Sequence, residues 1–106
     1  MAKRIVVWTE TAVRQRREIL SYWVKQNGTT TYAEKLIKLI AKQIRVIQGN
    51  PKLFKKTDFP DTHVSALGHF SIFYKFTKET LFITAFWDNR QNPKKLLEIL
   101  RKTNGK

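Results

Sequence analysis

Hydrophobic and polar residues alternate with two different periods along this chain, and the changes of period divide it into elements. Residues 4–8 are mostly β-branched or aromatic, which predicts a short strand. Thr9 then stands where a helix N-cap belongs. Apolar residues recur at helical spacing from there to Asn27-Gly28, a stop and turn signal. The pattern therefore predicts a first helix over about residues 10–26.

The next segment carries the clearest helical pattern. Thr31 and Glu34 fit a capping box, with a hydroxyl at the N-cap and a carboxylate three residues later. An apolar residue follows every three or four positions, and basic residues fill the opposite side. Gly49 and Pro51 then end the helix. Because the link between the two helices, residues 27–30, is short, we expect an antiparallel helical hairpin.

After Pro51 the period changes to that of strands. Residues 51–62 predict a basic loop or irregular strand. Residues 63–67, 70–77 and 81–87 are rich in aromatic and β-branched residues and predict three antiparallel strands. In the middle strand, alternation places Tyr74 on the face opposite Lys75, in the core.

The last element is a third helix. Asn92 fits the N-cap and Pro93 the first helical position, and the pattern continues to about Arg101. The element order is then β-α-α-β-β-β-α. This order predicts an α+β fold of two layers, with a helical hairpin packed on an antiparallel sheet. At 106 residues without repeats or linkers, we expect a single domain over residues 1–106.

Charge narrows the range of partners. Twenty-one Lys and Arg against eight Asp and Glu give a net charge of +13, which attracts RNA, DNA, the ribosome or an acidic protein. The chain has no cysteine and two histidines, so we expect no disulfide and no metal site built from the protein alone. Paired carboxylates for acid–base catalysis are absent from the pattern. We expect no cofactor.

The N-terminal apolar run covers four residues, which is shorter than a signal peptide requires. No stretch of the sequence approaches the length of a membrane span. We therefore expect a soluble cytoplasmic protein with no membrane partner.

The order of elements and their punctuation resemble the RelE/ParE superfamily of toxins over about residues 4–100. The segments that carry the resemblance are a strand followed by Thr9 and a helix with Ile19 and Tyr22-Trp23, then Tyr32-Ala33, Asn50-Pro51, residues 70–74 and residues 86–93. The resemblance implies the toxin half of a bacterial type II toxin–antitoxin pair, with a cognate antitoxin as partner. Some members of the superfamily are ribosome-dependent mRNA endonucleases, and others inhibit DNA gyrase.

The pattern of the nuclease members is incomplete in this chain. Where they carry an arginine after the aromatic of the central strand, this sequence has Ser71. Where a proton-transfer group often ends the last strand, it has Trp87, whose indole is no acid or base at neutral pH. The arginine a few residues later is matched by Arg90. Nuclease chemistry needs phosphate clamping and proton transfer, so these departures bear directly on it.

Three sets of site residues follow from the resemblance and from side-chain chemistry. Phosphate clamping and proton transfer are assigned to Arg90, Lys55, Lys56, Lys75 and His69. RNA contacts are assigned to Lys52, Ser71, Phe73, Trp87, Lys94 and Lys95. An acidic, partly disordered antitoxin segment is expected on the helical hairpin and the sheet groove, at Trp23, Tyr32, Leu96 and Leu100.

Three functions remain open. The working prediction is a ribosome-dependent mRNA endoribonuclease that inhibits translation, because the charge and Arg90 suit an RNA target. The alternative is a non-enzymatic inhibitor of DNA gyrase, because Ser71 and Trp87 replace groups that a nuclease uses. The third is a plain nucleic-acid-binding domain that stacks bases on Phe70, Phe73 and Phe82.

Overall fold

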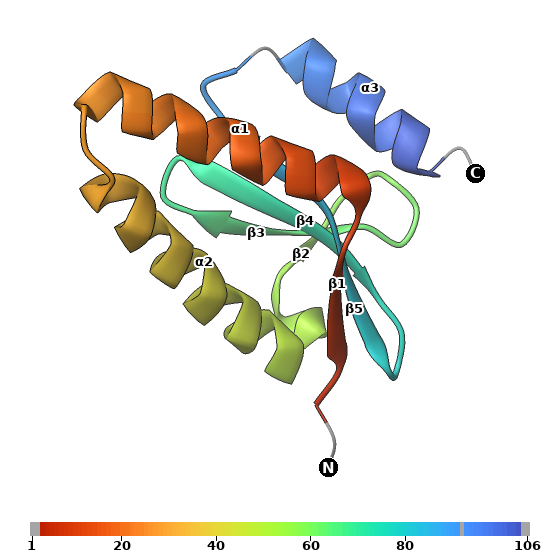
Figure 1. The fold of residues 1–106 in the computed structure, drawn as a ribbon. Coiled ribbons are helices and arrows are strands. Elements are labelled where there is room, and N and C mark those ends of the chain that lie inside the picture. Colours follow the sequence, from red (N-terminus) through yellow and green to blue (C-terminus); the bar gives the residue numbers. More distant parts are fainter. Residues whose placement is uncertain (1–2, 92, 105–106) are drawn as a thin grey trace.

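A computed structural model describes residues 3–91 and 93–104 of the chain (Figure 1). The elements are β1 (Ile5–Trp8), α1 (Glu10–Asn27), α2 (Thr31–Gly49), the 3₁₀ helix η1 (Pro51–Leu53), β2 (Lys55–Lys56), β3 (His63–Leu67), β4 (Phe70–Phe76), β5 (Thr80–Asp88) and α3 (Pro93–Asn104). The α+β fold with a helical hairpin on a largely antiparallel sheet is confirmed. None of the described helices combines the length and apolar character that crossing a membrane requires.

The five strands lie in the order β1-β5-β4-β3-β2, which the sequence pattern did not predict. The three neighbouring pairs from β5 to β2 are antiparallel, but β1 joins β5 in parallel, with Ile5 beside Thr80 and Trp8 beside Ile83. The expectation of a purely antiparallel sheet is therefore wrong at one edge. In chain order, the α1–α2 hairpin lies between β1 and the other four strands. The last strand, β5, then pairs in parallel with β1.

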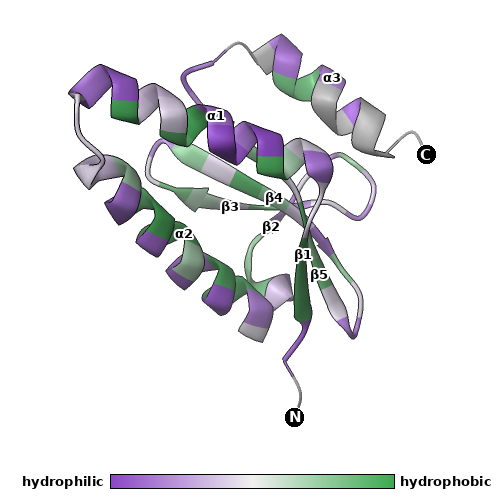
Figure 2. Cartoon of the chain, viewed as in Figure 1, coloured by the Kyte–Doolittle hydropathy of each residue, from purple (hydrophilic) through white to green (hydrophobic). Residues whose placement is uncertain are grey.

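The main core lies between the helical hairpin and one face of the sheet. The apolar sides of α1 and α2 turn towards the strands, and polar residues colour their outer sides (Figure 2). Buried side chains from both layers meet there: Ile19, Leu36, Ile40, Ile44 and Ile47 from the helices, and Phe70, Ile72, Tyr74, Leu81, Ile83 and Phe86 from the sheet. Burial of this apolar surface holds the two layers together.

A β-bulge in β5 decides which side chains reach that core. Phe73 pairs with Ala85 and Tyr74 pairs with Ile83, so Thr84 has no partner on β4. The extra residue shifts the alternation, so that Ile83 and Phe86 both face the helices. Without it, a strict period of two would place Phe86 on the opposite face.

The opposite face of the sheet carries a second, smaller cluster. Phe73, Ala85 and Trp87 are buried there, and Leu96 of α3 packs on them. The third helix therefore covers part of the face that the helical hairpin leaves open, which adds to the expected two layers. This burial depends on the same bulge, since Ala85 and Trp87 lie on the face opposite Phe86.

Some expected boundaries shift. The hydroxyl of Thr9 accepts from the amide of Ala12, as an N-cap should. The N-cap of α2 is Thr30 rather than Thr31, and its hydroxyl donates to Glu34 at 2.6 Å. The expected loop over 51–62 contains η1 and β2. The expected N-cap Asn92 lies outside the described residues.

Tyr74 lies in the core as expected, and its hydroxyl donates a 2.6 Å hydrogen bond to the carbonyl of Pro51. Burial raises the pKa of this phenol to about 12, above its ordinary value of 10.0. The folded state thus favours the neutral phenol. Its contribution to stability should be complete below about pH 10 and be lost as the pH rises towards about 12.

We expect Tyr74→Phe to remove this alkaline loss of stability. At neutral pH the same change should lower the free energy of unfolding by about 1 kcal/mol, because the Pro51 carbonyl loses its donor. Urea denaturation at a series of pH values checks both effects. Equal alkaline losses in the wild type and the variant would contradict the assignment to Tyr74.

Candidate functional site

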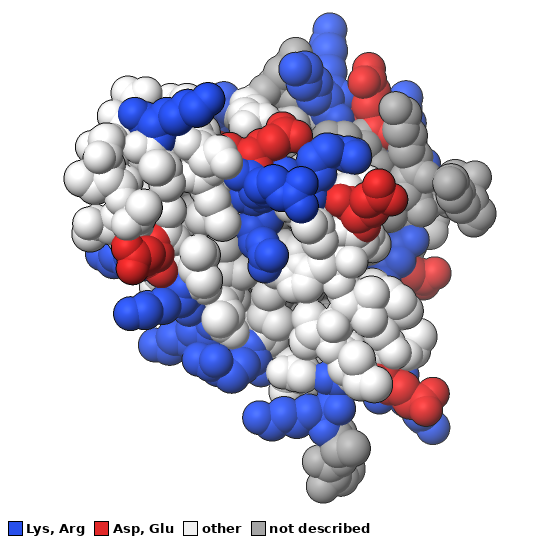
Figure 3. Space-filling view, viewed as in Figure 1, with Lys and Arg blue, Asp and Glu red and all other residues white. Residues whose placement is uncertain are grey.

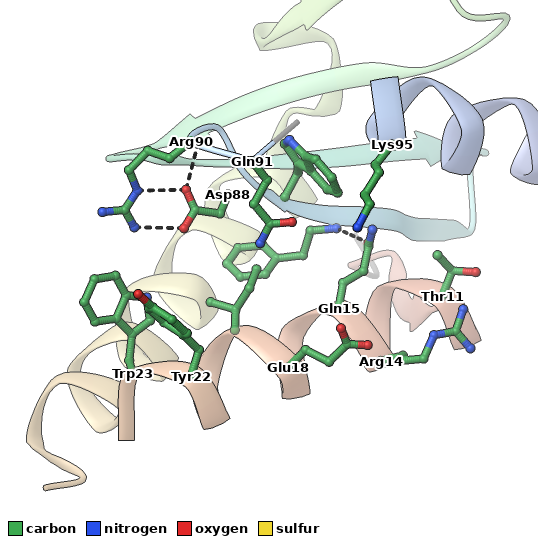
Figure 4. A pocket seen from close by; sticks show the side chains of 13 residues that line it. Thr11, Arg14, Gln15, Glu18, Tyr22, Trp23, Asp88, Arg90, Gln91 and Lys95 are labelled. Carbon is green, nitrogen blue, oxygen red and sulfur yellow. Dashed lines mark hydrogen bonds and ion pairs between the residues drawn. The ribbon is translucent and has the colours of Figure 1, made fainter. Parts of the chain in front are cut away.

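A cleft of about 640 Å³ lies between α1, the second half of β5 and the segment that leads into α3. Figure 4 shows its side chains, with those of α1 on one side and those of Gln91 and Lys95 reaching towards them from the other. Among its lining residues are Gln15, Glu18, Tyr22, Trp23, Arg90 and Lys95. Aromatic, amide and charged groups thus share one concave surface, which is typical of a binding site.

The cleft exists because β1 is shorter than β5. The parallel pairing ends where Trp8 lies beside Ile83, so residues 84–88 have no strand on that side. The side chain of Gln15 takes the place of a strand there and accepts from the amide of Phe86 at 2.9 Å. An open sheet edge therefore forms one wall of the cleft, and α1 forms the other.

Arg90 and Asp88 form a bidentate ion pair at one end of the cleft. The Arg90 Nε and Nη2 atoms donate to the two carboxylate oxygens at 2.9 and 2.8 Å, and the Arg90 amide donates to Oδ1 at 3.0 Å. The guanidinium also lies over the ring of Trp23, 5.1 Å from its centroid. Three contacts thus fix the orientation of the arginine.

The hydrogen bonds from Arg90 lower the pKa of Asp88, against the opposing effect of burial. The same hydrogen bonds raise the pKa of Arg90. Both groups are therefore charged at neutral pH, and much of the positive charge of Arg90 is compensated within the chain.

Aromatic rings continue the cleft along α1. Trp23 packs edge-on against Tyr22 and against Tyr32 of α2, with 5.1 Å between ring centroids in each pair. Two donors nearby, Trp23 Nε1 and Gln15 Nε2, are buried and have no hydrogen-bond partner in the described structure. An acceptor on a bound partner would satisfy them.

Of the residues assigned to catalysis, His69 lies beside Arg90, but the three lysines do not. Lys55 and Lys56 are exposed on β2, at the far edge of the sheet, and β3 and β4 lie between β2 and β5. Lys75 is half-buried on β4, opposite Phe82. His69 is exposed in the turn that precedes β4, and its carbonyl accepts from the amide that follows Asp88.

The other histidine lies on β3, away from Arg90. His63 stacks on Tyr74, with 5.5 Å between the ring centroids. Burial, and then the charge of Lys56, lower its pKa. It is therefore a neutral aromatic group beside the core at physiological pH.

The residues assigned to RNA contacts divide into two groups. Ser71, Phe73 and Trp87 are buried, as is Phe70, whereas Phe82 is half-buried. Ser71 donates to the side chain of Asn89 at 2.9 Å. The lysines of the set, Lys52, Lys94 and Lys95, are exposed. Burial leaves the rings of Phe73 and Trp87 little surface on which bases could stack.

Of the residues assigned to the antitoxin, Trp23 and Tyr32 lie together. Trp23 lines the cleft and contacts Tyr32, and Leu96 packs under α3 against the second cluster. The side chain of Leu100 lies outside the described residues. Sequence reasoning missed Gln15, because its role depends on the distant strand edge and leaves no local signal. The ion pair between Asp88 and Arg90 had a local signal, the two-residue spacing between opposite charges.

Metal binding requires at least three suitable ligands close together. Within residues 3–91 and 93–104, no group of three or more His, Asp or Glu side chains is placed to hold a metal ion.

Asp88→Asn should weaken the fold slightly and in a pH-dependent way. The depressed pKa of Asp88 means that the ionised carboxylate stabilises the folded state above its ordinary value of 3.8 and that this contribution is lost as the pH falls below it. Because Arg90 is 47 % exposed, we expect a fall of up to about fivefold in the folding equilibrium constant at pH 7. Urea titrations at pH 7 and at about pH 3 measure it, and a difference that persists undiminished in acid would contradict this account.

Comparison with known proteins places the chain among toxins. A family model described as "ParE toxin of type II toxin-antitoxin system, parDE" matches residues 6–93. One similar solved structure is a chain described as "Chromosomal ParDE TA system from P. aeruginosa", with a TM-score of 0.68 and 19 % identity over 79 % of this chain and 94 % of that one. The curated protein sequences contained no match.

Proposed function

This chain belongs to the ParE family of toxins from type II toxin–antitoxin systems, and we propose that it acts by binding and inhibiting DNA gyrase rather than by cleaving RNA. A cognate antitoxin is its natural partner within such a system. Gyrase inhibition was the alternative function in the sequence analysis. It is preferred here because ParE toxins as a family generally inhibit gyrase.

The state of Arg90 carries the proposal. A nuclease needs a cation free to stabilise the charge that develops on the scissile phosphate. Here the Asp88 carboxylate occupies the Nε–Nη2 edge of the guanidinium at 2.9 and 2.8 Å and compensates much of its charge. A phosphate at the remaining edge would meet a cation that is already paired and would approach the carboxylate, whereas an inhibitor that acts by binding needs no free cation.

The positions of the proton-transfer candidates support the same function. A general acid or base must lie within hydrogen-bond reach of the reacting atom. Lys55 and Lys56 are separated from β5 by two strands, and His63 stacks against the core. His69 is the exception, because its carbonyl accepts from the amide of Asn89 beside Arg90, but its side chain is exposed to solvent.

The cleft beside α1 is the proposed docking site of the antitoxin. An open strand edge, the aromatic rings of Tyr22 and Trp23, and two unpartnered donors favour an extended or helical peptide with apolar anchors. Arg14 and Lys95 also line the cleft, so acidic residues beside those anchors would find opposite charges. Such a segment matches the acidic antitoxin expected for a chain of charge +13.

The test measures supercoiling and mRNA cleavage with the same preparation. Stoichiometric amounts of the chain should block ATP-dependent supercoiling of relaxed plasmid by gyrase, and added antitoxin should restore it. The same amounts should leave mRNA on translating ribosomes intact. Unimpaired supercoiling, together with new mRNA ends that disappear in Arg90→Ala, would replace the proposal with the ribonuclease function.

A further inference from the structure

Four basic residues form a line along the outward side of α2. Lys35, Lys38, Lys42 and Arg45 are spaced by three or four positions, so they share one side of the helix, opposite the buried Leu36, Ile40, Ile44 and Ile47. We call these four residues the α2 basic stripe. All four are exposed, and the side chains of α2 gather as one blue area at the lower left of Figure 3.

The segment that contains the stripe holds a disproportionate share of the charge. Residues 35–57 carry seven Lys or Arg and no Asp or Glu, so this segment contributes +7 of the net +13. The three cations beyond the stripe are exposed on η1 and on β2, the strand at one edge of the sheet: Lys52, Lys55 and Lys56. None of the seven takes part in an ion pair among the described residues. Their positive charges are therefore exposed to solvent and are not neutralised by acidic side chains of the described residues.

We infer that the α2 basic stripe binds the phosphodiester backbone of a nucleic-acid duplex. Ten residues of helix rise by about 15 Å from Lys35 to Arg45. Duplex DNA presents one negative charge for about every 1.7 Å of its axis, so phosphates are available along the whole stripe. A straight row of long, flexible cations suits contacts to a backbone that carries no sequence information.

The composition of the stripe favours a polyphosphate over an acidic protein. Lysine is depleted in the cores of protein interfaces, where aromatic residues and arginine provide the anchors. Three of the four stripe residues are lysines, and the outward side of α2 carries no aromatic residue. The aromatic residues that suit a protein partner lie elsewhere, in the cleft beside α1.

The stripe is independent of the proposed gyrase inhibition and of the cleft. Figure 1 shows α2 on one side of α1 and the segment leading to α3 on the other. A nucleic acid along α2 therefore leaves the cleft open to a protein. A toxin held on a duplex in this way would be concentrated close to any target that itself works on nucleic acid.

The experiment compares two variants of equal charge. In the stripe variant, Lys35, Lys38, Lys42 and Arg45 are all replaced by Gln. In the control variant, Lys3, Arg17, Lys25 and Lys78, which are exposed but lie outside residues 35–57, are replaced in the same way. Each set removes four cations and lowers the net charge from +13 to +9. Gln has nearly the helix propensity of Lys, and thermal melts followed by circular dichroism verify that both variants fold.

Fluorescence anisotropy with a labelled mixed-sequence DNA duplex, over a series of salt concentrations, gives the result. The slope of log affinity against log salt should fall in magnitude by up to about 3.6 in the stripe variant, since each lost phosphate contact accounts for about 0.9. In the control variant this slope should change by less than about 0.9, the value for a single phosphate contact. Equal slopes in the two variants would overturn the inference.

Two further arms identify the ligand. If an RNA duplex also binds and loses the same salt dependence in the stripe variant, the stripe recognises the phosphodiester backbone that both duplexes share. The ratio of the two affinities then shows whether DNA or RNA is preferred. Polyglutamate of equal charge serves as an acidic polypeptide. Tighter, stripe-dependent binding to polyglutamate than to either duplex would overturn the assignment to nucleic acid. Gyrase inhibition is measured separately on both variants, so its presence or absence does not decide this test.

Discussion

Trp23→Ala is expected to weaken the binding of the cognate antitoxin by about thirtyfold or more, which corresponds to about 2 kcal/mol. The ring of Trp23 lies in the cleft between two tyrosines and beneath the guanidinium of Arg90. Removing it takes away the apolar surface for an anchor, the unpartnered indole donor and the support of the arginine. Aromatic residues in such central positions carry much of the free energy of binding in protein interfaces. Isothermal titration with the antitoxin measures the loss.

Two companion variants make this prediction specific. Trp23→Phe keeps a ring under Arg90 and should lose much less affinity than Trp23→Ala. Phe82→Ala removes an aromatic side chain from the other face of the sheet and should leave affinity unchanged. Thermal melts separate loss of binding from loss of folding. If Phe82→Ala weakened binding as much as Trp23→Ala, the antitoxin would dock elsewhere.

Phe86→Ala is expected to lower the free energy of unfolding by about 3–5 kcal/mol. Phe86 is fully buried, and its ring stacks on that of Phe70 with 5.4 Å between the centroids. The smaller side chain leaves a cavity between the helical hairpin and the sheet, in the wall of the cleft. Urea denaturation followed by circular dichroism measures the change.

Phe82→Ala is the matched control for this variant as well. It removes the same atoms from the same strand, but Phe82 is half-buried, so less apolar surface is lost. We expect it to cost clearly less than Phe86→Ala. Equal losses would mean that the bulge at Thr84 does not place Phe86 in the main core as described.

The sequence predicted the helices and most strands because their signals are local. The apolar period of α2 and the turn before β4 each lie within a few neighbouring residues. The parallel pairing of β1 with β5 was missed because nothing near Ile5 indicates a partner 75 residues away. The bulge at Thr84 was missed for a similar reason, since an extra residue in a strand becomes visible only against its partner strand.

The candidate site was predicted in part. Arg90, Trp23 and Tyr32 were all proposed through the resemblance to the toxin superfamily. The type of a residue does not reveal its position in the fold. Lys55 and Lys56 were therefore grouped with Arg90, although two strands separate them from β5. The turn after β5 brings the guanidinium of Arg90 onto the carboxylate of Asp88. The spacing of the two residues in the sequence does not by itself define this turn.

The pairing of β1 with β5 also sets the order of events during synthesis. Ile5 emerges from the ribosome early but finds its partner at Thr80, and the hydroxyl of Thr9 bonds to a carbonyl 75 residues later. At typical translation rates, about 4–15 s pass between the two. Until then the apolar side of the helical hairpin has no sheet to cover it, and the cleft lacks the wall formed by residues 84–88. The cleft is therefore complete only when synthesis is nearly finished, because residues 84–88 are among the last to be made.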